Sequence, residues 1–406
     1  MTTVLIFLLV LGLLVFVHEM GHFLVARRNG IKADEFGFGF PPRIFGLVRD
    51  DEDKKWRFIL GSREMNLKEK VSVATHSVGN TVSSEYSPDE LSYKHTIYSL
   101  NWIPLGGFVK IKGEDGEAKD ADSFATKSAW IRIKVLAAGV TMNFLLAWVL
   151  ISVVLMAGFP QQVDPNEPVS GNRDIQISQV LPNTPAEAMG LRFGDKILSI
   201  DEMTALSVAQ VQEYIIAHKG QELSMKVQRG TQTLALKGMP RAEYPKNEGA
   251  LGIGLGETEM KQYVWYKALP EGAVTTYHLT SSMVSGIFGI LKGLVTGTHE
   301  GLSDVSGPVG IAKLTGQVND LGLVYLLYFA AILSINLGII NILPIPALDG
   351  GRILFILIEV AKGSPVSQKV EGIFHQIGFM LLLLLMLLVT VNDFSKFHIF
   401  GRLFGG

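Results

Sequence analysis

Two histidines and a glutamate lie within a long apolar run near the start of the chain. His18, Glu19 and His22 fall inside the apolar residues 4–26, and a run of this length can cross a bilayer, which takes about 20 residues. Histidines at positions i and i+4 share one face of a helix, and the glutamate lies beside that face. A charged residue at mid-membrane costs about 2.5–3.5 kcal/mol even on insertion scales, so the cluster predicts a site that compensates for its ionisable side chains.

The spacing of these side chains favours a zinc site. Two neutral imidazoles fill two coordination positions and leave room for a third protein ligand and a water molecule, which Glu19 can deprotonate. The five-residue pattern alone is a weaker signal in a soluble helix, where solvated side chains without a metal are the common alternative. Inside a membrane span that alternative is expensive. We therefore predict one Zn2+ per chain, bound by His18 and His22, with Glu19 as the catalytic base.

The composition favours an integral membrane protein over a soluble enzyme. Of the 406 residues, 48% are hydrophobic and only 18% are charged, and the mean hydropathy is +0.30. A net charge of −2 gives no support for nucleic-acid binding, which needs a clustered basic excess. The chain has no cysteine, so a zinc site must use histidine and carboxylate ligands.

Four apolar segments are long enough to span a membrane: residues 4–26, 133–159, 323–343 and 373–391. Basic residues close the first span and open the second, namely Arg27, Arg28, Lys127, Arg132 and Lys134. The positive-inside rule then makes the intervening loop cytoplasmic and places the zinc site toward the cytoplasmic side, although Lys396 and Arg402 lie on the side assigned to the exterior. The first span ends in two arginines rather than at a small-residue cleavage site, so we expect it to be retained.

The loop after the first span has strand character at residues 56–60 and 102–112. We expect residues 104–107, Pro-Leu-Gly-Gly, to break the second strand. Apolar strands beside membrane spans are tolerated where they line a protein cavity, so a re-entrant hairpin near the metal is one interpretation and an ordinary surface hairpin is the other. Residues 63–94 are polar and predict a flexible insertion.

Residues 174–241 alternate strand-like runs with turns and contain one helical patch at 208–218, which predicts a small soluble domain. Residues 185–191 and 193–201 resemble the PDZ fold in its bacterial protease arrangement. Such a domain captures a peptide by strand addition and would control substrate access, or it acts only as a spacer that occludes the site. Residues 263–298 mix apolar side chains with Ser, Thr and Gly, which favours an amphipathic helix on the membrane surface over a fifth span.

The best candidate for a third metal ligand is Asp349, which follows Pro344 and Pro346 and precedes two glycines. The prolines end the third span and free backbone groups where a cavity can satisfy them. Glu359, His375 and Asp393 are the alternatives. Counting about 1.5 Å per helical residue, the third span reaches a depth similar to that of His18.

Two asparagines, Asn336 and Asn341, also lie in the third span. Side chains of this type could bind the backbone of a substrate or hydrogen-bond a neighbouring helix.

Several short motifs, spread over nearly the whole chain, match the motifs of one known family. They are residues 18–22 followed by two arginines, then 104–109, 139–144, the PDZ-like segment, 307–311, 336–351 and 392–395. In these motifs the chain resembles the site-2 protease family of intramembrane zinc metalloproteases, and most closely its bacterial regulator of sigma-E protease group, here with one PDZ-like domain.

The resemblance implies that zinc is bound by His18, His22 and Asp349 and that Glu19 activates water. It also implies a role in substrate handling for the segment with Asn336, Asn341, Pro344 and Pro346. The expected substrates are single-span membrane proteins already shortened by another protease, such as an anti-sigma factor, or remnant signal peptides.

We thus expect a polytopic α-helical membrane protein with four transmembrane helices, an inserted α+β PDZ-like domain and a membrane-associated β-hairpin region. The expected divisions are residues 1–26 (first span), 27–129 (cytoplasmic or re-entrant loop), 130–159 (second span), 160–262 (extracytoplasmic PDZ-like domain), 263–320 (membrane-surface segment), 321–391 (third and fourth spans) and 392–406 (tail). The expected function is zinc-dependent intramembrane proteolysis at the bacterial inner membrane, without nucleic acid. A membrane ion or metal transporter and a membrane-tethered peptidase acting on soluble proteins are the alternatives.

Overall fold

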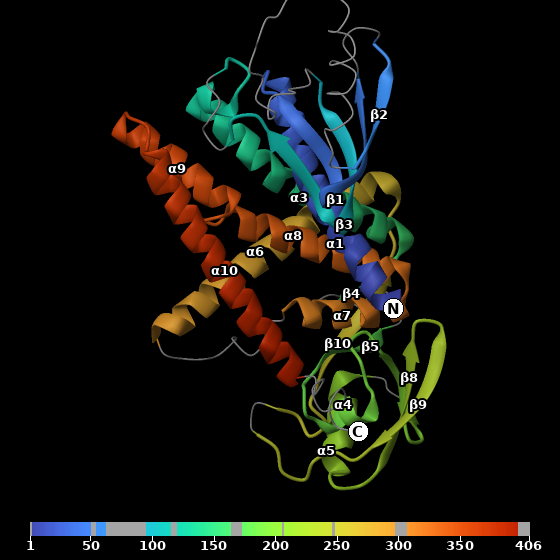
Figure 1. Ribbon diagram of the computed structural model, residues 1–406. Coiled ribbons are helices and arrows are strands. Elements are labelled where there is room, and N and C mark those ends of the chain that lie inside the picture. The colour runs from blue at the N-terminus through green and yellow to red at the C-terminus, as the bar shows by residue number, and fades with distance from the viewer. Residues whose placement is uncertain are drawn as a thin grey trace, which may run out of the picture. The chain divides into compact units, whose positions relative to one another are not determined.

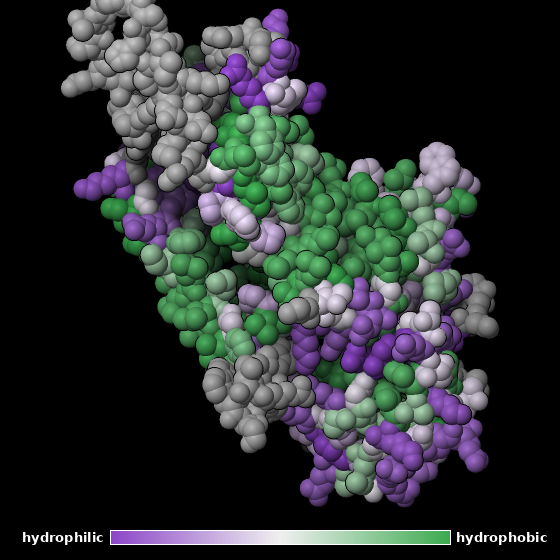
Figure 2. Space-filling model, turned by 45° about the vertical axis from the view of Figure 1, so that its right-hand side comes forward, coloured by the Kyte–Doolittle hydropathy of each residue, from purple (hydrophilic) through white to green (hydrophobic). Residues whose placement is uncertain are grey.

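Four helices of the computed structural model are long and apolar enough to cross a membrane (Figure 1). They are α1 (Thr2–Arg28), α3 (Ala129–Ala157), α8 (Leu323–Ile342) and α10 (Gln368–Lys396), and they confirm the four predicted spans. The structure describes residues 2–49, 54–61, 95–114, 120–163, 173–204, 207–245, 248–296 and 307–396. The insertion predicted at residues 63–94 therefore lies outside the described residues. In Figure 2 hydrophobic side chains cover much of the helical surface in view.

The chain divides into two compact units. One comprises Leu8–Leu146 and Ser334–Leu382, and it contains all of the candidate zinc ligands predicted from the sequence except Asp393. The other comprises Met1–Phe7, Ala147–Leu333 and Leu383–Gly406.

A three-stranded sheet belongs to the first of these units, with the order β2-β1-β3. Its strands are β1 (Ala33–Arg49), β2 (Trp56–Leu60) and β3 (Ile97–Ile111), and β2 confirms the strand predicted at residues 56–60. The two long strands pair with each other more than once. Phe36 has both Val109 and Tyr98 as partners, and Tyr98 also pairs with Leu47. Each long strand thus bends and supplies two paired segments to the sheet.

The break expected at residues 104–107 is wrong, because β3 continues through them from Ile97 to Ile111. Gly106 adopts φ +123°, a conformation open to glycine. The chain can therefore change direction and pairing partner there without leaving the sheet. The turn-forming composition of these residues thus allows a bend within the strand and does not end it.

The sheet packs directly on α1, the helix that carries the paired histidines. Phe23 stacks on Phe36 with ring centroids 4.6 Å apart, and Phe16 lies 5.2 Å from the same ring. A Cβ on Gly107 would lie 2.9 Å from the Cα of Phe16, so only glycine lets β3 come this close to the helix. The aromatic contacts fix the sheet against the turns of α1 that flank His18.

Helix α3 approaches the other side of the paired histidines through glycines. A Cβ on Gly21 would overlap the carbonyl oxygen of Ala138 and lie 2.7 Å from its carbonyl carbon. Small residues at such a contact let two helix backbones come close, which favours association of helices in lipid. The glycine within the histidine motif is thus required by helix packing rather than by the metal.

The second unit contains a seven-stranded antiparallel sheet in the order β4-β10-β5-β6-β8-β9, with β7 paired to β6. Its strands are β4 (Phe159–Gln162), β5 (Asp174–Val180), β6 (Lys196–Ile200), β7 (Met203–Thr204), β8 (Leu223–Arg229), β9 (Gln232–Gly238) and β10 (Ile253–Lys261). Helices α4 (Pro185–Met189) and α5 (Val208–Ala217) accompany it, and α5 confirms the helix predicted at 208–218.

A buried core and a buried ion pair hold this sheet and its helices together. Ile177, Ile200 and Met225 form part of one apolar cluster and are fully buried. The buried Asp195 accepts two hydrogen bonds of 2.7 Å from Arg229, and this partner raises the pKa of the guanidinium above its usual range. Breaking such a pair from one side leaves an uncompensated buried charge.

Two more helices belong to the second unit, α6 (Trp265–Thr296) and α7 (Pro308–Leu321). The helix expected over residues 263–298 is confirmed by α6, and neither α6 nor α7 qualifies as a membrane span by length and composition. Their location at a membrane surface remains a prediction.

We predict that Gly21→Ala destabilises the protein, because the new methyl group would meet the Ala138 backbone, which cannot rotate away. Overpacking of this kind costs about 1–3 kcal/mol, so the thermal midpoint in detergent should fall. Gly12→Ala is the matched control on the same helix, since its Cβ would lie 3.3 Å from the Phe38 ring, which can adjust. Equal midpoints for the two variants would contradict the assigned helix contact.

Candidate metal centre

The turn between α8 and α9 (Asp349–Lys362) presents Asp349 at the first position of the new helix. Helix α8 ends at Ile342, two residues before Pro344, as expected from the prolines. A Cβ on Gly350 would overlap the Leu343 carbonyl oxygen, and one on Gly351 would overlap that of Ile345. The two glycines after the aspartate therefore let α9 begin while packed against the turn itself.

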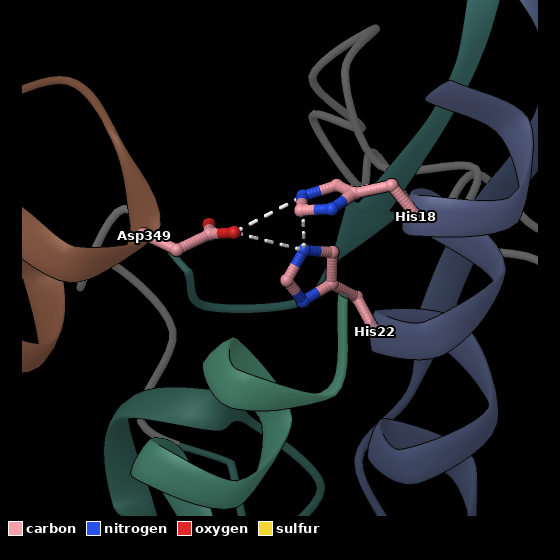
Figure 3. A group of neighbouring side chains, drawn as sticks. All are labelled: His18, His22 and Asp349. Atoms are coloured by element: carbon pink, nitrogen blue, oxygen red, sulfur yellow. Dashed lines mark hydrogen bonds and ion pairs between the residues drawn. The ribbon is translucent and has the colours of Figure 1, made fainter. Parts of the chain in front are cut away.

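The side chains of His18, His22 and Asp349 converge on one point (Figure 3). The two Nε2 atoms are 3.1 Å apart, and Oδ2 of Asp349 lies 3.0 Å from Nε2 of His18 and 3.4 Å from Nε2 of His22. Zinc ligands at about 2.0–2.1 Å in a tetrahedral arrangement are about 3.3 Å from one another. The three distances thus match three corners of a zinc tetrahedron.

The protonation of His22 is set by α3. Nδ1 of His22 lies 2.8 Å from the carbonyl oxygen of Val135, which can only accept a hydrogen bond. The proton is therefore on Nδ1, and the lone pair of Nε2 is free to bind a metal. A backbone carbonyl in this position is a common outer partner of a zinc-bound histidine.

The partner of His18 is Asn143, whose side chain is fully buried. Its Nδ2 is placed 3.1 Å from Nδ1 of His18, while its Oδ1 has no hydrogen-bond partner. The two ends of an amide are assigned from the hydrogen-bond network. With Oδ1 turned toward Nδ1 of His18, the oxygen gains a donor and Nε2 of His18 keeps its lone pair. The buried, unpartnered oxygen thus fits a zinc-binding His18.

Space for the imidazoles comes from Gly139 on α3. A Cβ at this position would lie 2.7 Å from Cε1 of His18 and would overlap Nε2 of His22. The donor set of two imidazoles and one carboxylate would suit Zn2+, which in catalytic sites takes three protein ligands. The described residues therefore fit the metal that the sequence predicts.

Glu19 lies next to this cluster on α1 and is half-buried. It interacts electrostatically with both histidines and with Asp349, so its carboxylate is near the converging ligand atoms without being one of them. This is the arrangement expected of a general base beside a metal.

The three alternative ligands have other partners. Glu359 forms an ion pair of 2.9 Å with Arg132. His375 accepts a hydrogen bond of 2.8 Å from the N–H of Ala347. Asp393 is buried and accepts hydrogen bonds from the N–H groups of Gly307 and Gly310, at the start of α7. Among the described residues, the possible metal-binding group contains only His18, His22 and Asp349.

The residues predicted for substrate binding lie on α8 and the turn that follows it. Asn336 and Asn341 are half-buried, Pro344 is exposed, and Pro346 packs against Gly378 of α10. Asn143 and Gly139 were not predicted as site residues, although both belong to a motif noted in the sequence. A buried asparagine in an otherwise apolar span was the available signal for Asn143.

Comparison with known proteins decides the family. The model of peptidase family M50 matches residues 6–78 and 89–385. The chain belongs to this family. It is 33% identical to the zinc metalloprotease RasP of Geobacillus kaustophilus and to the regulator of sigma-W protease RasP of Bacillus subtilis, covering 97% of this chain and 98% of each relative. A putative zinc metalloprotease of Clostridium perfringens is 31% identical over 95% of this chain and 96% of its own length.

The M50 chain is therefore a zinc metalloprotease, and the resemblance to site-2 proteases is confirmed. Its four apolar helices and these relatives support an integral protein of the inner (plasma) membrane that acts in site-2 protease-type regulated proteolysis.

We predict that the partner of His18 controls metal affinity. Asn143→Leu keeps the volume of the side chain but removes the acceptor for Nδ1–H, so zinc affinity should fall about 10- to 100-fold, as is usual for loss of an outer partner. Asn143→Asp can only accept, and it should retain zinc. Metal competition with a chromophoric chelator measures both. If Asn143→Asp lost zinc as Asn143→Leu does, the amide would instead donate to His18.

Proposed function

We propose that this M50 protease cleaves membrane proteins within or near the bilayer, with His18, His22 and Asp349 as zinc ligands and Glu19 as the catalytic base. The observation that carries the proposal is the convergence of three ligand atoms within 3.4 Å of one another, beside a glutamate on a membrane-spanning helix. Zinc, when bound, supplies positive charge that polarises the scissile carbonyl and makes water more acidic.

The protein's own groups handle the protons. Glu19 accepts a proton from the attacking water and then donates it to the nitrogen of the leaving amine, as a general base and acid in turn. Asn143 and the Val135 carbonyl hold the two imidazoles in the tautomer with a free Nε2. Neither partner needs to exchange a proton during the reaction.

The outer segment of β3 offers a place for the substrate. Residues Gly107–Lys110 pair with β1 on one side, and Gly107 lies against Phe16, three residues before Glu19 on α1. An extended peptide that adds to a free strand edge gains backbone hydrogen bonds and exposes its amide bonds. We place the unwound substrate segment along this edge, which gives the predicted re-entrant hairpin its role.

The segment with Asn336, Asn341, Pro344 and Pro346 would bind the substrate from the other side. Within the part of the chain that the structure describes, neither asparagine side chain has a hydrogen-bond partner. Their amides are thus available to the backbone of an unwound helix, which must replace its lost hydrogen bonds in an apolar environment.

Single-span membrane proteins are the proposed substrates, already shortened outside the membrane by another protease. One relative is named regulator of sigma-W protease, which supports an anti-sigma factor as a substrate; remnant signal peptides fit the same chemistry. The seven-stranded domain is the proposed PDZ-like domain, on the extracytoplasmic side, where it would limit access by long substrates. Helices α6 and α7 would lie at the membrane surface, and the metal centre toward the cytoplasmic side.

We predict that Glu19→Gln abolishes cleavage and retains zinc. Glutamine is nearly isosteric with glutamate but cannot accept the proton, and Glu19 is not among the converging ligands. Cleavage of a model single-span substrate in detergent and metal analysis of the same preparation measure the two effects. Cleavage by the variant at a near wild-type rate would contradict the role assigned to Glu19.

We predict that Asp349→Asn loses zinc and lowers the thermal midpoint. The proposed zinc ligands come from α1 and α9, so a bound metal would link two distant parts of the chain. A metal bound only by the assembled state stabilises it by about 2.7 kcal/mol at a hundredfold excess over Kd. Glu19→Gln is the control, with little change in either quantity. A full equivalent of zinc in Asp349→Asn at an unchanged midpoint would exclude Asp349 as a ligand.

A further inference from the structure

The backbone just before Asp349 adopts an unusual conformation. Ala347 has φ +71°, in the left-handed region that residues with a Cβ rarely occupy. Such a conformation persists where the surrounding structure imposes it, and conformations of this kind are enriched at functional sites. Only Leu348 lies between Ala347 and Asp349, whose carboxylate converges with the histidines, so a contact that fixes Ala347 also affects the direction of Asp349.

Helix α10 supplies a hydrogen-bond acceptor for this turn. The N–H of Ala347 donates to Nδ1 of His375 at 2.8 Å. Because Nδ1 accepts, the neutral imidazole carries its proton on Nε2, which lies 3.8 Å from a carboxylate oxygen of Glu371 one turn earlier. Nε2 is buried and has no hydrogen-bond partner among the described residues, so the ring is oriented through Nδ1, with this acceptor toward the turn.

One turn after His375, a glycine lets the two segments touch. A Cβ on Gly378 would overlap the Cβ of Pro346 and lie 3.0 Å from its carbonyl carbon. Gly378 is buried, although α10 is the least buried of the four candidate spans: only 6% of its most apolar 18-residue stretch is buried. The close contact of α10 with the turn is therefore a local feature and does not reflect general packing of the helix.

We propose that His375 is a positioning residue for the metal centre: its Nδ1 holds the left-handed turn at Ala347, and this fixes the direction in which Asp349 presents its carboxylate. The role of His375 rests on the proposed role of Asp349 as a zinc ligand. The sequence analysis named His375 as an alternative zinc ligand. In the structure its Nδ1 instead accepts a hydrogen bond from the backbone N–H of Ala347, in the turn that carries Asp349.

The test compares side chains that differ in the acceptor. His375→Asn can place an amide oxygen near the position of Nδ1, whereas His375→Phe keeps the ring and removes the acceptor. Gln376→Leu, on an exposed neighbouring position, is the control. His375 lines a cavity of about 360 Å³, so both substitutions have room without disturbing a packed core.

The main measurement is the rate at which purified full-length protein releases zinc to a chelator. We expect His375→Phe to release zinc at least about tenfold faster, in line with other outer partners of metal sites, and His375→Asn and Gln376→Leu to stay within about twofold of wild type. The kcat of His375→Phe should fall with KM nearly unchanged, because the substrate edge is intact. Wild-type zinc release by His375→Phe, or equal release by the Phe and Asn variants, would overturn the proposal.

A purely structural role predicts a different pattern. In that case the thermal midpoint of the zinc-free protein would fall in His375→Phe, and such a fall would also overturn the proposal. Gly378→Ala is an independent variant, since it should push Pro346 away and speed zinc release with the imidazole still present; wild-type release by a folded Gly378→Ala protein would count against the turn contact. Asp349→Asn serves as the reference: if it retains zinc, the proposed ligand set fails, whereas zinc loss in Asp349→Asn but not in His375→Phe refutes the positioning role alone.

Discussion

The structure of the unit that contains the candidate metal centre depends on bringing two imidazoles and a carboxylate within 3.0–3.4 Å of each other. Without a cation such a group is unfavourable in apolar surroundings, where a charged side chain costs several kcal/mol and cannot be relieved by water. The helices that carry and surround these side chains pack closely, and glycines at their contacts make this possible. Gly21 and Gly139 bring α3 against the histidines, and Gly350 and Gly351 allow α9 to begin at the carboxylate. Four glycines thus permit the close packing that brings these three side chains together.

Much of this could be predicted from the sequence, because the signals are local or periodic. The four spans follow from apolar length, and the shared face of His18 and His22 follows from the helical repeat. The end of α8 before Pro344 follows from the missing N–H of proline. In each case the residues that decide the outcome lie within a few positions of one another, so no knowledge of tertiary contacts is needed.

The candidates for the third ligand could be ranked from the sequence, but what distinguishes them is their partners in distant parts of the chain. Glu359 is occupied by Arg132, more than two hundred residues earlier in the chain. The carboxylate of Asp393 binds the N–H groups that begin α7, a favourable place for a negative charge at a helix N-terminus. The same limit explains the error in β3, where Gly106 and Gly107 indicate a turn in isolation. Their actual use is a close approach to α1.

Helix α10 illustrates how a single polar contact from a mostly exposed helix can act on a neighbouring turn. Its apolar side chains are mostly exposed, as expected for a surface that faces lipid. Lipid provides no hydrophobic force between helices, and a polar contact between helices contributes only about 1 kcal/mol. A hydrogen bond from the N–H of Ala347 to His375 therefore adds little to overall stability. Its proposed effect is on direction, because it acts on the turn whose next polar side chain is Asp349. Precision at the metal centre can thus come from a helix that contributes no ligand to it and little burial to the fold.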